Sequence, residues 1–141
     1  MVAIPVPSHA EPLRVLVADG GRPASVALAD WLREQTGIEI QGPISPLAAT
    51  IALAAKFRPH VVLLDFHGLP VSVGYTVALL KEFEPAPAVF VLTHEASDAM
   101  RRRCREARVD AVFDKTTELE SLARSLTGLT ETRRRDGILG S

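Results

Sequence analysis

Four polar residues follow apolar runs of the chain, and their types suit phosphoryl transfer to a carboxylate. Asp19, Asp65 and Thr93 each come at the end of such a run, and Lys115 follows the last run closely. An aspartate with an ordinary pKa of about 3.9 is ionised at neutral pH and can attack phosphorus to give an acyl phosphate. Asp65 is therefore the candidate nucleophile.

The other residues of this set could offset the charge of the incoming group. A phosphoryl group is highly anionic, so a divalent cation held by one or two carboxylates is needed, and Mg²⁺ suits because it keeps several waters. Asp19 and Asp65 are the candidate metal ligands. The Lys115 ammonium can pair with one phosphoryl oxygen, and the Thr93 hydroxyl can donate a hydrogen bond to another.

The apolar runs predict the strands that position these residues. They are continuous rather than alternating, which is typical of a parallel sheet covered on both faces. We expect strands over residues 13–18, 38–44, 60–65, 88–93 and 109–113.

Segments with helical features follow each strand. The first is opened by Pro23 and closed by Gly37, and the last begins with a glutamate three residues after a threonine and runs to about Leu126. The others span residues 47–57, 71–83 and 96–107. Five successive strand–helix units with right-handed crossovers predict a doubly wound α/β sandwich. In such a sheet, ligands bind at the carboxyl ends of the strands, where the four polar residues would converge.

Composition predicts a single globular domain. The chain has 141 residues, is 47% hydrophobic and carries a formal charge of -1, which argues against bulk electrostatic binding of nucleic acid. Cys104 is the single cysteine, so an internal disulfide and a cysteine-based zinc site are both excluded, and a reducing cytoplasm is the expected compartment. The sequence has no phosphate-cradling glycine pattern of the kind that binds nucleotides. Residues 1–12 lack signal-peptide or membrane-anchor features and predict a flexible tail, as do residues 128–141, leaving 13–127 as the domain.

The chain resembles the receiver domains of bacterial two-component response regulators, including the chemotaxis type, from about Leu13 to Leu126. The resemblance rests on five segments in order: LRVLVAD (13–19), HVVLLDF (60–66), Pro70 with Gly74, VFVLT (89–93) and DAVFDK (110–115). It implies a flavodoxin-like five-stranded parallel sheet of order 2-1-3-4-5.

The resemblance also implies a function in phosphorelay signal transduction. A partner histidine kinase or phosphotransfer protein would donate phosphate to Asp65. Thr93 would then move toward the phosphoryl group and reposition the surface of the fourth helix, fifth strand and fifth helix. The chain would act as a phosphoacceptor signalling domain rather than as an enzyme, and nucleic acid would be reached only through a separate output domain.

Some residues depart from the family pattern. Gly20 stands where the family usually has a second acid, which predicts weaker Mg²⁺ binding. The loop after Asp65 is one residue longer than usual before its proline, and His67 becomes the expected donor of the backbone carbonyl to the metal. His94 replaces a very small residue and would crowd the phosphorylation site, and Val112 occupies the usual aromatic switch position.

These departures keep a second hypothesis open. The domain would then be a receiver-like module that docks or dimerises without phosphorylation. For either hypothesis, the run from Arg101 to Arg103 with Arg105 and Arg108 predicts a basic helix face. A solvated face is its default interpretation, and the family resemblance points to an acidic protein partner or self-pairing there.

Overall fold

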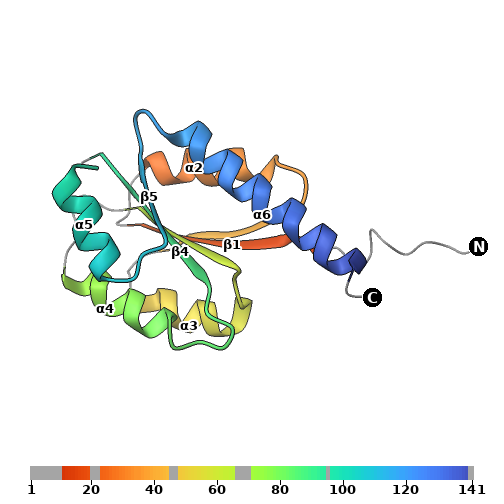
Figure 1. Ribbon diagram of the computed structural model, residues 1–141, viewed down its shortest axis with the longest axis horizontal. Helices are drawn as coiled ribbons and strands as arrows, with labels where there is room; N and C mark the ends of the chain where they lie inside the picture. Colours follow the sequence, from red (N-terminus) through yellow and green to blue (C-terminus); the bar gives the residue numbers. More distant parts are fainter. Residues whose placement is uncertain (1–10, 20–22, 45–47, 66–70, 95, 140–141) are drawn as a thin grey trace, which may run out of the picture.

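The structure is a computed structural model that describes residues 11–19, 23–44, 48–65, 71–94 and 96–139. Within these residues, five parallel strands form one sheet in the order β2-β1-β3-β4-β5, with helices on both faces (Figure 1). This confirms the predicted doubly wound, flavodoxin-like fold. The strands are β1 (Leu13–Asp19), β2 (Ile38–Ile44), β3 (Val61–Asp65), β4 (Ala88–Thr93) and β5 (Ala111–Asp114). The helices are α2 (Pro23–Arg33), α3 (Ala48–Phe57), α4 (Val71–Leu80), α5 (Asp98–Glu106) and α6 (Leu119–Leu139).

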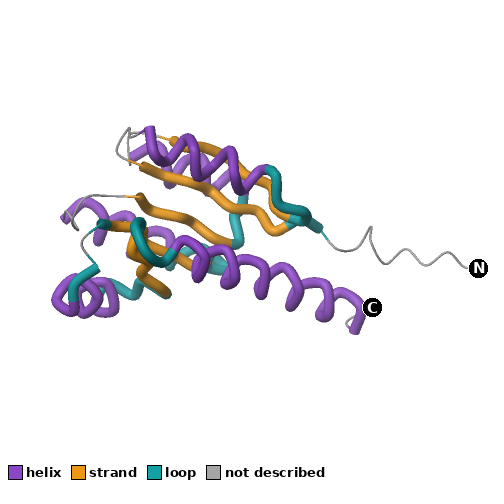
Figure 2. Tube along the Cα trace, turned by 90° about the horizontal axis from the view of Figure 1, so that it is seen from above, coloured by secondary structure: helices purple, strands orange, loops and turns teal. Residues whose placement is uncertain are grey.

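The sheet separates two hydrophobic cores, and residues of β3 face both of them. Val61 and Leu63 pack into the core that is covered by α2 and α6, whereas Val62 and Leu64 pack into the core beneath α3, α4 and α5. Figure 2 shows the long helix α6, which leads to the C-terminus, alongside the strands. Side chains alternate between the two faces of a strand, so both sets of positions must be apolar when both faces are covered. All four side chains are fully buried.

The last helix is longer than the sequence predicts. We expected it to end near Leu126 and a flexible tail to begin at Gly128, but α6 continues to Leu139. Leu129 packs against the core formed with α2, and this contact outweighs the helix-weakening effect of Gly128, which is about 1 kcal/mol relative to alanine. The Thr130 hydroxyl also donates a hydrogen bond to the Leu126 carbonyl, so the predicted tail is wrong for residues 128–139. No helix among the described residues is both long and apolar enough to span a membrane.

Strand β2 lies at one edge of the sheet and bends there. Gly42 has a φ of +103°, and a Cβ at this position would lie 2.3 Å from the Val17 carbonyl oxygen. Its pairing register with β1 shifts between Leu16 and Ala18. Only glycine fits this close approach of two backbones, and Pro43 follows it directly.

Helix α5 begins directly after Ser97, its N-cap residue, whose side chain accepts a hydrogen bond from the Met100 amide. Met100 and Cys104, which lie one helical turn apart, are its buried residues. Burial raises the pKa of the Cys104 thiol above its ordinary value, an effect that the nearby Arg103 and Arg101 charges partly oppose. Cys104 is therefore a small core residue.

We expect Cys104 to react slowly with a thiol reagent in the folded protein, because the thiol is buried and its pKa is raised. Ellman's reagent should modify it at least about a hundredfold faster in denaturant than in buffer. A variant that combines Cys104→Ala with Thr127→Cys is the control, because Thr127 is exposed on α6. Equal rates for Cys104 and the exposed cysteine in buffer would contradict the burial of Cys104.

Candidate functional site

Asp65 and Lys115 form a buried ion pair at the carboxyl edge of the sheet. The Lys115 ammonium donates a hydrogen bond to Asp65 Oδ1 at 2.6 Å, although the residues are 50 positions apart. The side chains are 1% exposed for Asp65 and 9% for Lys115. Taking a carboxylate out of water is costly unless an opposite charge compensates it, and Lys115 supplies that charge.

The strand register brings the other predicted residues to the same edge. Asp65 lies opposite Asp19 of β1 on one side and opposite Leu92 of β4 on the other, so Thr93 comes one position beyond it. The Lys115 amide donates to the Thr93 carbonyl at 2.9 Å, and the Thr93 side chain is fully buried. The structure therefore gathers the backbones of the four residues that the sequence singled out.

The backbone register sets the two predicted metal ligands, Asp19 and Asp65, at facing positions of β1 and β3. Carboxylate oxygens are hard ligands of the kind that Mg²⁺ prefers, and an ion that keeps several waters needs only one or two of them. Among the described residues, groups of three or more His, Cys, Asp or Glu side chains with metal-binding geometry do not occur. His67 and Gly20, which bear on the predicted metal shell, lie outside the described residues.

The turn after β5 fixes Lys115 in place. The Asp114 carboxylate accepts hydrogen bonds from the Thr116 and Thr117 amides at 2.7 and 3.2 Å, and the Glu118 carboxylate accepts one from the Asp114 amide at 2.9 Å. The hydrogen bond from the Thr116 amide lowers the pKa of Asp114 from its ordinary value, aided by Thr117 and by the nearby His94. Hydrogen bonds from the Asp114 amide and the Arg101 side chain likewise lower the pKa of Glu118. The sequence predicted helix-start chemistry at Thr117 and Glu120, whereas the hydrogen bonds described here come from Asp114 and Glu118.

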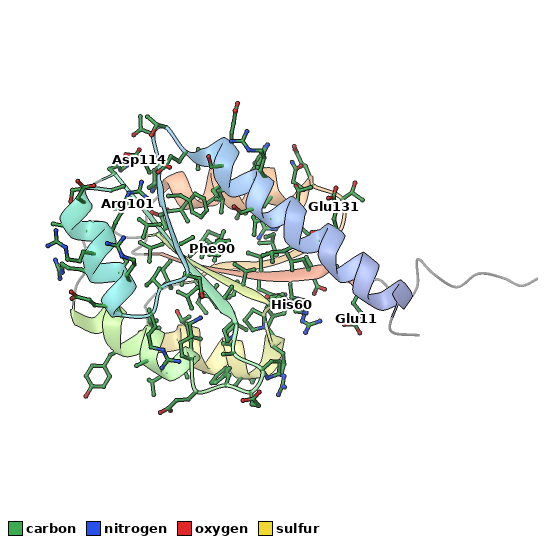
Figure 3. The ribbon with its side chains drawn as sticks, in the orientation of Figure 1. Glu11, His60, Phe90, Arg101, Asp114 and Glu131 are labelled. Carbon is green, nitrogen blue, oxygen red and sulfur yellow. The ribbon has the colours of Figure 1, made fainter. Side chains whose placement is uncertain are left out.

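Arg101 connects α5 to this turn, a role that the sequence did not reveal. Its guanidinium donates to Glu118 Oε1 at 2.6 Å and to the Val112 carbonyl at 3.0 Å. Figure 3 shows Arg101 on α5 near Asp114, the last residue of β5. A third bond reaches the Ala96 carbonyl at 3.3 Å. The sequence grouped Arg101 with a solvent-facing basic run, but its side chain binds within its own domain instead.

His94 lies beside a cavity on the α2 and α6 side of the sheet. Its Nδ1 atom is 3.2 Å from the Thr116 hydroxyl oxygen, and its side chain is exposed. The cavity has a volume of about 640 Å³ and also reaches Lys115. The residues that line it are Ala27, Leu28, Trp31, Leu92, His94, Lys115, Leu119, Glu120, Ala123 and Arg124.

We predict that Arg101→Met lowers the free energy of unfolding by about 1 kcal/mol, because it removes three hydrogen bonds from a partly exposed side chain. The matched variant Arg102→Met should change it by less than about 0.5 kcal/mol, because the Arg102 side chain is exposed. Urea denaturation followed by circular dichroism measures both. Equal effects of the two variants would remove the structural role of Arg101.

Comparisons with known proteins agree with this geometry. An uncharacterized response regulatory protein from Yersinia pestis is 31% identical over 117 residues, which cover 83% of this chain and 48% of that protein. A protein-glutamate methylesterase/protein-glutamine glutaminase from Anaeromyxobacter dehalogenans is 34% identical over 89 residues, covering 62% of this chain and 26% of that protein. The chain thus spans half or less of the length of these curated relatives. No family model matches the chain.

The fold has close counterparts among solved structures. The solution structure of a response regulator protein from Burkholderia multivorans superposes with a TM-score of 0.66 at 24% identity. The match covers 84% of this chain and 95% of that one. The chain is thus similar in sequence to part of a response regulatory protein, and its strand order and fold are those of a solved response regulator protein.

Proposed function

We propose that this domain accepts a phosphoryl group on Asp65 from a histidine kinase or a phosphotransfer protein. The observation that carries the proposal is the buried Asp65–Lys115 pair at the carboxyl edge of the sheet. Burying the charge of an aspartate at the end of an apolar strand costs free energy, which a purely structural role would not explain. A carboxylate held next to an ammonium at a ligand-binding edge is instead suited to receive an anionic group.

The transfer needs a carboxylate nucleophile and a cation for the transferred oxygens. An oxygen of Asp65 forms a bond to phosphorus while the phosphorus–nitrogen bond of a phosphohistidine breaks, and the departing imidazole takes a proton from solvent. Lys115 is already within hydrogen-bonding distance of Asp65, so its ammonium can bind a phosphoryl oxygen with a small movement. The Thr93 hydroxyl would donate a hydrogen bond to another phosphoryl oxygen.

Asp19 and Asp65 would hold Mg²⁺, with the His67 carbonyl as a further expected ligand. When bound, the ion would offset the negative charge of the transferred group. Gly20 supplies no carboxylate, so the site would bind the ion weakly. His94 Nδ1 lies 3.2 Å from the Thr116 hydroxyl oxygen, and the expectation that His94 crowds the phosphorylation site stays a prediction.

Intact-mass spectrometry after incubation with acetyl phosphate and Mg²⁺ tests the proposal. We expect the mass of one phosphoryl group to be added to the wild-type chain and not to Asp65→Asn. Asp30→Asn is the matched control, because Asp30 is an exposed acid on α2 that pairs with Arg33. It should be modified like the wild type.

If the folded wild-type chain stays unmodified, the phosphoacceptor proposal fails. The domain would then act as a docking or dimerisation module that works without phosphorylation. If Asp65→Asn is modified as fully as the wild type, another residue is the acceptor. Circular dichroism of each variant shows whether the fold is intact.

We further propose that α5, β5 and the start of α6 form the surface that responds to phosphorylation. Arg101 joins α5 to β5 through the Val112 carbonyl and to the turn directly before α6 through Glu118, so a shift of Lys115 or Thr93 would be transmitted to α5. Exposed arginines of α5 and the residues after it, including Arg102, Arg105 and Arg108, would favour an acidic partner or a second copy of the chain.

Hydrogen–deuterium exchange before and after phosphorylation measures this response. We expect the amide exchange rates of α5, β5 and the 114–118 turn to change, and those of α3 to stay within error. Arg101→Met should reduce the change in α5 while leaving phosphorylation of Asp65 detectable by mass. A response confined to α3 and α4 would contradict this assignment of the output surface.

A further inference from the structure

The cavity between α2 and α6 has the size and lining of a small-molecule site. Its volume of about 640 Å³ lies within the range of about 300–1,000 Å³ that is typical of ligand pockets. Both helices cover this face of the sheet (Figure 1). Most of the lining is hydrocarbon, and the buried Leu92 of β4 is part of it.

The two helices contribute apolar side chains that a folded domain would be expected to bury. Trp31 on α2 is 40% exposed and Leu119 on α6 is 41% exposed, and both line the cavity. Leu28 and Ala123 complete this apolar part. A flat hydrocarbon or aromatic group placed here would remove the exposed faces of Trp31 and Leu119 from water, which is favourable.

The cavity offers an anionic group two cationic partners. Lys115 and Arg124 are positively charged, and their negative neighbours are Glu120 in the lining and Asp65, which is hydrogen-bonded to Lys115. Lys115 is mostly buried, so its charge is less screened by solvent than that of the exposed Arg124. An anionic group would therefore be directed toward Lys115, the one charged lining residue that also belongs to the Asp65 pair.

We propose that this cavity binds a small, flat, mostly apolar molecule that carries one negatively charged group. The apolar part lies against Trp31 and Leu119, and the charged group is directed toward the Lys115 ammonium. Because Lys115 also binds Asp65, the ligand and the Asp65 carboxylate compete for the same ammonium. The proposal does not depend on whether Asp65 accepts a phosphoryl group.

Two fluorescent probes that differ in one charge test the site. The probes are 8-anilinonaphthalene-1-sulfonate, which is anionic, and N-phenyl-1-naphthylamine, which lacks the sulfonate. Trp31 is the single tryptophan of the chain, so its emission reports occupancy of this cavity directly. We expect saturable quenching of Trp31 by both probes, with tighter binding of the anionic one.

Ala123→Phe should fill part of the cavity and weaken the binding of both probes about tenfold. Ala52→Phe is the matched control, because Ala52 is exposed on α3, on the other face of the sheet, and it should bind like the wild type. Equal binding by the two variants and the wild type would overturn the proposal. So would binding of the probes without a change in Trp31 emission.

A third variant tests the role assigned to Lys115. Asp65→Asn removes the competing carboxylate, so the anionic probe should bind roughly fivefold more tightly while the neutral probe is unchanged. The same change for both probes would show that the sulfonate does not meet Lys115 and would overturn the assigned orientation. Thermal melts followed by circular dichroism establish that each variant is folded when its binding is measured.

Discussion

The Asp65–Lys115 ion pair is the constraint on which the rest of the domain depends. Removing a single ion from water costs several kcal/mol even after the protein relaxes, so neither group can be buried without the other. The partners come from β3 and from the turn after β5, with β4 between them in the sheet. The pair therefore forms only when the strands have the observed order and register, which links the chemistry of the edge to the fold as a whole.

Much of this arrangement could be predicted from local sequence. Continuous apolar runs identified the strands, and the acids at their ends identified Asp19 and Asp65, because parallel strands of a doubly wound sheet end at one edge. Thr93 was singled out by the resemblance to receiver domains. The predictions that were wrong concern features that tertiary contacts determine. Gly128 was expected to end the last helix, but Leu129 packs against the hydrophobic core and α6 continues to Leu139.

Arg101 shows a different limit of the sequence. Its partners lie 11 and 17 positions away, and a run of neighbouring arginines gave no sign that one of them would bind inside the domain. The structure shows what the bond does: Arg101 holds Glu118, which holds the Asp114 amide next to Lys115. The position of the Lys115 ammonium thus depends on the guanidinium of Arg101, which belongs to α5. The cavity beside Lys115 could not be predicted from the sequence either, because α2 and α6 contribute to it from distant parts of the chain.

The two outermost strands also limit how copies of the domain can assemble. An edge strand with a free row of amides and carbonyls invites pairing with a strand from another molecule. Here β2 is bent at Gly42 and lacks an amide hydrogen at Pro43, while β5 is only four residues long and its Val112 carbonyl accepts the Arg101 guanidinium. Neither edge presents an uninterrupted template for a continuous intermolecular sheet. Side chains of the helices are therefore better suited than these strand edges to make contacts between molecules, and their charges can be altered by point substitutions without changing the backbone of the sheet.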